Sequence, residues 1–108
     1  MREVVYYQTA GGESPFAVWL ASLDDRTAAR IATTVRRMEL GNFGDSKGVG
    51  GGVMERRLTF GPGYRLYYGQ DGGTIVVLLI GGTKQRQSRD IAKAKEYWAD
   101  YLEGRSDD

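Results

Sequence analysis

The chain has 108 residues, which is near the common size of one domain, and it contains neither cysteine nor histidine. Their absence excludes disulfides, thiolate chemistry, a histidine-containing catalytic triad and the usual zinc ligands. The net charge is only +1, but residues 54–105 hold nine basic side chains against six acidic ones. We therefore expect a single domain over residues 1–108, with a modestly basic surface in its second half and a polar tail at about 104–108.

The apolar segments are short. The first eight residues are charged at their start and soon turn polar, so they lack the apolar core of a signal peptide. The run from Ile75 to Ile80 is far too short to cross a bilayer. We expect a cytoplasmic protein that makes no membrane contact.

The first half of the sequence predicts a strand followed by a helical hairpin. Val4 to Thr9 is rich in β-formers and ends at a glycine pair. Ser14-Pro15 is typical of a helix start, since serine caps free amides and proline loses no hydrogen bond there. Asp24-Asp25 predicts the cap of a second helix that stops near Gly41-Asn42. The inward face expected for this second helix is Ala28, Ile31, Ala32, Val35 and Met38.

The second half predicts a three-stranded meander and a final helix. Residues 41–52 are rich in glycine and lack periodicity, which indicates a surface loop. The segments 51–60 and 64–69 are predicted strands, joined by a turn at Gly61-Pro62-Gly63. A third strand, Thr74 to Ile80, is apolar throughout and belongs in the middle of the sheet. A helix from about Ser88 to Leu102 closes an α+β fold, with Trp98 and Tyr101 in its core-facing register.

Arginines on both sides of the hairpin turn are the main functional signal. Alternation along the strands places Arg57 opposite Leu58, and places Arg65 with Tyr67 on one face. Arg57 should then lie a few residues from Arg65 across the ladder, near enough for one phosphate to bridge them. Lys84 adds a cation where a strand leads into a helix, a place that attracts anions. The further phosphate-binding candidates are Lys47, Arg56, Tyr67 and Arg86.

These cations fit a ribonuclease that uses the 2′-hydroxyl as its nucleophile. Such an enzyme needs a base, positive charge at the phosphorus and an acid for the leaving oxygen. Glu55 is a conceivable base, although a salt bridge with Arg57 on the same face is equally natural. Arginine and tyrosine side chains also often do no more than cover a sheet face.

The glycine-rich segment is not a nucleotide-binding loop. Residues 48–52 lack the strand-loop-helix setting and the Gly-Lys-Ser or Gly-Lys-Thr ending that such loops require. We expect neither a cofactor nor a metal.

Three motifs together resemble one toxin family. Glu55-x-Arg57-Leu58, the run from Phe60 to Tyr68 and Gly81-Gly82-x-Lys84 resemble the RelE/ParE toxin superfamily. The resemblance is greatest to its HigB-like, phage-associated "addiction module killer protein" branch, and it extends over nearly the whole chain. It implies a RelE/ParE-like fold and the toxin component of a type II toxin-antitoxin system.

The resemblance also implies an activity and partners. Many members are metal-independent endoribonucleases (mRNA interferases) that cleave mRNA, commonly at the ribosome. Carried over, the catalytic positions are Arg57, Arg65 and Lys84, with Lys47 as the loop lysine. The implied partners are mRNA, the ribosome and a cognate antitoxin, typically a helix-turn-helix protein from the adjacent gene.

Two alternatives stay open. A ParE-like toxin would inhibit DNA gyrase without cutting nucleic acid. A binding module could also have kept the fold without toxicity, which the replacement of the family's usual acidic residue by Thr83 favours.

Overall fold

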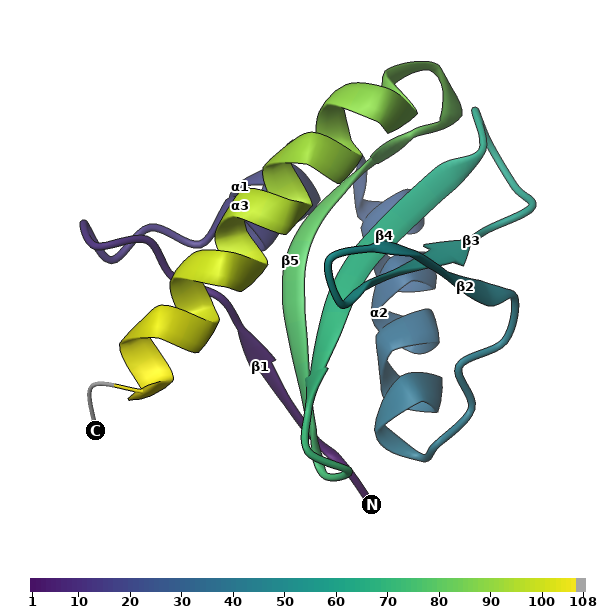
Figure 1. Ribbon diagram of the computed structural model, residues 1–108. Coiled ribbons are helices and arrows are strands. Elements are labelled where there is room, and N and C mark those ends of the chain that lie inside the picture. Colours follow the sequence, from purple (N-terminus) through teal and green to yellow (C-terminus); the bar gives the residue numbers. More distant parts are fainter. Residues whose placement is uncertain (107–108) are drawn as a thin grey trace.

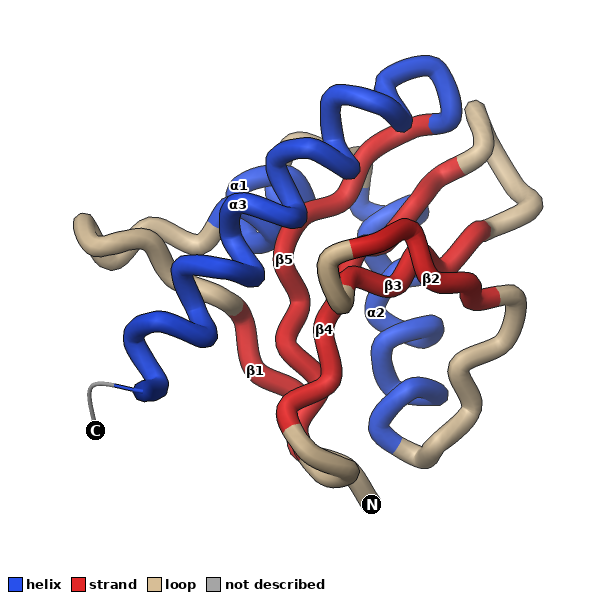
Figure 2. Tube along the Cα trace, viewed as in Figure 1, coloured by secondary structure: helices blue, strands red, loops and turns tan. Residues whose placement is uncertain are grey.

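A computed structural model describes residues 1–106, and these form one mixed β-sheet with helices on both faces (Figures 1 and 2). The α1 and α2 helices lie on one face, whereas the long α3 helix crosses the other. The predicted α+β class is confirmed. In chain order, the elements are β1 (Glu3–Tyr6), α1 (Pro15–Ala21), α2 (Asp25–Glu39), β2 (Ser46–Gly50), β3 (Val53–Arg57), β4 (Tyr64–Asp71), β5 (Ile75–Thr83), the 3-10 turn η1 (Lys84–Arg86) and α3 (Gln87–Ser106).

The sheet order is β1-β5-β4-β3-β2. The β1 strand runs parallel to β5, and all other neighbours are antiparallel. Because β5 has a strand on each side and helices on each face, its nearly continuous apolar sequence is buried as predicted. It extends to Thr83, so Gly81 and Gly82 lie inside the strand instead of following it.

The predicted loop at residues 41–52 is wrong, because Ser46–Gly50 forms the edge strand β2. This segment has little intrinsic strand preference, and it is ordered by hydrogen bonding to β3. The β3 strand is shorter than predicted and ends at Arg57, although the Leu58 amide still donates to the Tyr64 carbonyl at 2.9 Å. The opening strand also ends early, at Tyr6, because the chain then turns and the Thr9 amide donates to Glu13.

The predicted helix starts are confirmed by side-chain caps. Ser14 accepts from the Ala17 amide ahead of Pro15, and Asp24 accepts from the Thr27 amide. Ala32 is exposed, contrary to its predicted place on the inward face of α2. The buried face of this helix is formed by Ile31, Thr34 and Met38, and Ala32 lies beside it. The final helix also extends past the predicted end at Leu102 to Ser106, so the polar tail is helical there; residues 107–108 lie outside the described part.

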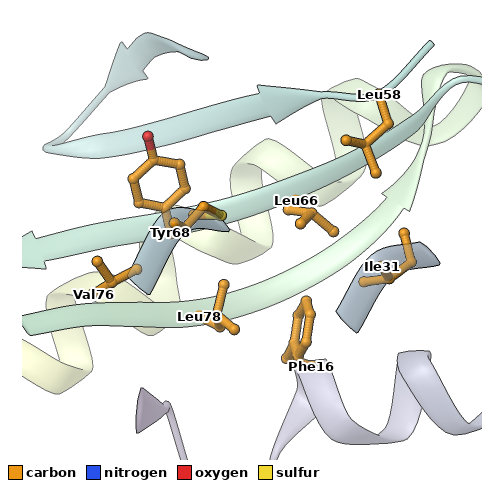
Figure 3. Packing of buried hydrophobic residues seen from close by; sticks show 8 residues of the cluster. Phe16, Ile31, Leu58, Leu66, Tyr68, Val76 and Leu78 are labelled. Carbon is orange, nitrogen blue, oxygen red and sulfur yellow. The ribbon is translucent and has the colours of Figure 1, made fainter. Parts of the chain in front are cut away.

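Two hydrophobic clusters fill the space on either side of the sheet. Under α1 and α2, Phe16 and Ile31 point toward strand residues including Leu66, Tyr68 and Leu78 (Figure 3). Under α3, the predicted core residue Trp98 packs on the opposite face, together with Tyr7, Val53, Tyr67, Val77, Leu79 and Ala94, and the predicted Tyr101 packs against this cluster half-buried. The odd and even residues of β4 and β5 therefore serve different cores, which fixes the face on which each functional side chain lies.

Candidate active site

Arg57 and Arg65 are direct partners in the β3–β4 ladder. The sequence predicted a separation of a few residues, so the structure brings them closer than expected. Directly opposite side chains lie on the same face with Cβ atoms about 4.5–5.5 Å apart, and like charges in such a pair repel. An anion bound between the two guanidinium groups would offset this repulsion.

The two arginines differ in exposure. Arg65 is only 8% exposed, and its Nη1 donates to the carbonyls of Gly63 and Tyr64 at 3.1 and 3.3 Å. Its Nε is buried without a hydrogen-bond partner, and no ion pair of the described residues includes it. Arg57 is half-buried as a residue, its side chain is 39% exposed, and it pairs with Asp45 at 3.0 Å. A pair this exposed contributes little stability, so a ligand can displace it at low cost.

The hairpin turn brings Lys84 to the same place. Gly63 has a φ of 80°, and its carbonyl accepts from the Lys84 amide at 2.8 Å. A side chain on Gly63 would lie 3.2 Å from Lys84 Cβ and 3.5 Å from Arg65 Nη1. Glycine at this position therefore lets the exposed Lys84 and the buried Arg65 approach each other.

A buried carboxyl lies two residues along β3 from the arginine pair. Glu55 is fully buried, and its Oε2 accepts from the Tyr67 hydroxyl at 3.0 Å and from Gln87 Nε2 at 2.8 Å. Its Oε1 is buried with no partner. Burial raises the pKa of Tyr67, and the hydrogen bond to Glu55 raises it further, so this hydroxyl stays a donor. No ion pair joins Glu55 to Arg57, which pairs with Asp45.

The other site residues predicted from the sequence lie farther from the Arg57–Arg65 pair or face away from it. Lys47 is the exposed β2 partner of Glu55, so it lies on the same face. Tyr67 is fully buried, and it reaches the site through Glu55 instead of through the surface. Arg56 faces the α2 side, where its Nη1 donates to the Arg57 carbonyl at 3.0 Å. Arg86 is exposed at the end of η1.

Asp90 was not singled out as a site residue from the sequence. Its side chain comes down from the first turn of α3 against Gly82, the β5 partner of Arg65. The residue is 7% exposed and its Oδ2 has no hydrogen-bond partner. Burial raises the pKa of Asp90, and the nearby positive charges of Arg86 and Arg89 oppose this only in part. Asp90 reaches this position only because α3 packs on β5, and no pattern in the local sequence predicts which strand a helix packs on.

Residues 1–106 offer neither a metal cluster nor a membrane-spanning helix. This part of the chain contains no group of three or more acidic side chains arranged to hold a metal ion. It also contains no helix with the length and apolarity needed to span a bilayer.

Comparison with known proteins places the chain in a family. It is 43% identical over 81 residues to an uncharacterized protein from Haemophilus influenzae strain Rd, and the match covers 74% of this chain and 82% of the relative. The chain belongs to the same family as that protein. No known protein-family profile matches the sequence. Membership in this family assigns no activity to the chain.

The geometry suits recognition of a phosphodiester. Arg57, Arg65 and Lys84 supply fixed and mobile positive charge at one end of the sheet, and guanidinium groups can bind phosphate oxygens through two parallel hydrogen bonds. Beside them, Glu55 is held by two donors on a single oxygen. The site thus combines anion binding with a carboxyl group placed on the same sheet face.

Proposed function

We propose that this protein is the toxin component of a type II toxin-antitoxin system with a RelE/ParE-like, HigB-like fold. In this proposal it is a metal-independent endoribonuclease that cleaves ribosome-associated mRNA in the cytoplasm. The observation that carries the proposal is the direct pairing of Arg57 with Arg65, adjacent to the buried Glu55. A cognate antitoxin would neutralise the protein by covering this end of the sheet.

In the proposed reaction the RNA 2′-hydroxyl oxygen attacks the adjacent phosphorus. The O2′–P bond forms while the P–O5′ bond breaks, which leaves a 2′,3′-cyclic phosphate and a free 5′-hydroxyl. Negative charge grows on the non-bridging oxygens during this step. Arg57 and Arg65 stabilise that charge, and their placement on rigid strands removes the cost of assembling them during the reaction.

Two protons must move for the reaction to balance. Glu55 fits the base by position, because it lies two residues from Arg57 on the same strand face and its Oε1 has no partner. Since that oxygen is buried, the packing over Glu55 must open before the RNA 2′-hydroxyl can reach it. Tyr67 and Gln87 hold the other oxygen and so orient this one. The exposed ammonium of Lys84, beside Arg65, can give a proton to the leaving 5′-oxygen.

Induced expression in bacteria, with RNA ends mapped by sequencing, tests the proposal. We expect growth arrest with new mRNA ends inside reading frames, and we expect Arg65→Ala to lower cleavage at least 100-fold, a loss typical of one oxyanion-stabilising group. Arg65→Lys keeps the charge without the planar fork and should recover only part of the activity. Arg26→Ala, at an exposed position of α2 outside the site, is the matched control.

The result that would overturn the proposal is growth arrest with intact mRNA. Inhibition of DNA supercoiling by the purified wild-type protein would then favour the gyrase-directed alternative. Normal growth with a folded product, shown by circular dichroism, would instead indicate a binding module without toxicity.

A further inference from the structure

A second concentration of arginines lies on the α2 face of the sheet. Residues of α2 and of the segment that follows β3 line an open groove of about 300 Å³, which we call the arginine groove. This volume is at the lower end of the range for ligand sites in proteins. Its lining residues are Arg30, Thr33, Thr34, Arg37, Asp45, Arg56, Arg57, Leu58, Thr59 and Phe60.

The arginine groove has a large excess of positive charge. Four guanidinium groups face one carboxylate, that of Asp45, which is paired with Arg57. The ion pairs of the described residues leave Arg30, Arg37 and Arg56 without a carboxylate partner. The Nε of Arg56 is also buried with no hydrogen-bond partner. This concentration of unneutralised charge favours an anionic ligand.

One contact in the groove favours a nucleotide over an acidic peptide. The guanidinium carbon of Arg30 lies 3.7 Å from the centroid of the Phe60 ring, so the planar group is stacked on an aromatic face. Arg30 is exposed, and the other face of its guanidinium group is a flat surface of the kind on which a base stacks. A carboxylate side chain would use the charge of Arg30 but would gain nothing from this platform.

Arg57 joins the groove to the proposed active site. It lines the arginine groove and is also the strand partner of Arg65. Since it lies at the end of β3, a single nucleic-acid strand can pass from the groove around this edge to the arginine pair. Arg57 therefore belongs to both sites.

We propose that the arginine groove binds a backbone phosphate of the RNA strand outside the cleaved linkage, with one base stacked on Arg30. This inference rests on the proposed function, because it extends the same substrate beyond the reacting phosphodiester. Arg30 and Arg37 hold the phosphate and set the register of the strand, while Arg57 serves both sites.

The test uses a fluorescent single-stranded RNA with 2′-O-methyl groups throughout, which binds but cannot be cleaved through its 2′-oxygens. Fluorescence anisotropy should show at least a tenfold loss of affinity for Arg30→Ala/Arg37→Ala. Because the loss of one bound phosphate lowers the salt slope of single-strand binding by about 0.7, and both arginines hold the same phosphate, this double variant should lower it by about 0.7. Phe60→Leu keeps all the charges and should weaken binding several-fold through lost stacking.

Arg26→Ala/Arg36→Ala is the matched control, since it removes the same charge from the same helix at exposed positions outside the groove. Equal losses in the two double variants would overturn the proposal in favour of diffuse electrostatic attraction. Competition by a glutamate-rich peptide that exceeds that of RNA, and that depends on Arg30 and Arg37, would overturn it in favour of an acidic protein segment. Circular dichroism and thermal melting establish that each variant is folded.

Failure of this inference is distinguishable from failure of the proposed function. If wild-type protein cleaves mRNA but the groove variants bind and cleave as the controls do, the inference alone is wrong. If no cleavage occurs yet RNA binding depends on Arg30 and Arg37, the groove is a nucleic-acid site and the catalytic proposal is wrong.

Discussion

The carboxyl group of Asp90 occupies the space that a side chain on Gly82 would fill. A Cβ at that position would meet Asp90 Oδ2 well inside contact distance and Cγ at 2.8 Å. This contact sets the distance between the first turn of α3 and β5. It thereby positions Gln87 to donate its hydrogen bond to Glu55. The shape of the proposed active site therefore depends on a residue that carries no side chain.

Gly82→Ala should destabilise the fold by about 1–3 kcal/mol, the usual cost of overpacking a well-packed position. Urea denaturation measures this change. Gly73→Ala is the control, because nothing lies within 4 Å of its added Cβ and its φ is not positive. Equal stability of the two variants would contradict the close packing of α3 on β5.

Asp90→Asn should change the pH dependence of stability. The folded-state pKa of Asp90 is raised above its ordinary 3.8, so the folded state binds this proton more tightly than the unfolded state does. The contribution of Asp90 to the free energy of unfolding therefore falls as pH rises from about 3.8 through the folded pKa. The free energy of unfolding of the variant minus that of wild type should therefore increase as the pH is raised. Below pH 3.8, where Asp90 is protonated in both states, this pH-dependent increase should be absent.

Denaturation of both proteins from pH 3 to pH 8 measures the difference. A difference that does not vary with pH would show that Asp90 titrates normally in the folded state.

Tyr67→Phe should lower the free energy of unfolding by about 1–3 kcal/mol, since it removes a donor from a buried carboxyl oxygen. Glu55→Gln removes the charge that this donor satisfies, so the double variant should lose less than the sum of the two single losses. A double-mutant cycle by chemical denaturation measures the coupling. Additive losses would mean that the hydrogen bond contributes nothing of its own.

Asp45→Asn should strengthen RNA binding two- to fivefold by freeing Arg57 from its ion pair. The stability change should stay within about 1 kcal/mol, because the pair is exposed. Anisotropy with the 2′-O-methyl RNA gives the affinity, and urea denaturation gives the stability. Unchanged affinity would indicate that Arg57 does not contact RNA.

Local chemistry determined what could be predicted from sequence. Ser14 and Asp24 cap helices through neighbours three residues away, so short patterns located both helix starts. The Gly61-Pro62-Gly63 turn likewise revealed the hairpin and the proximity of Arg57 to Arg65. In each case the interacting groups are close in sequence, and residue type alone restricts their geometry.

The features that sequence did not reveal depend on distant contacts. The β2 strand forms only because β3 offers it hydrogen bonds, and its own residues are poor strand formers. Gln87 and Glu55 are 32 residues apart, and the arginine groove joins α2 to the end of β3. Periodicity describes which face of an element is apolar, but it does not tell which two elements meet.

The parallel pairing of β1 with β5 has a consequence for folding order. The first strand has no partner until the segment that contains Ile75, the partner of Glu3, has been synthesised. Glu55 likewise lacks one of its hydrogen-bond donors until Gln87 has been synthesised. Such long sequence separations are slow to close. A nascent chain on the ribosome therefore holds its arginines on an unfinished sheet, and the complete site comes into existence only when the last helix docks.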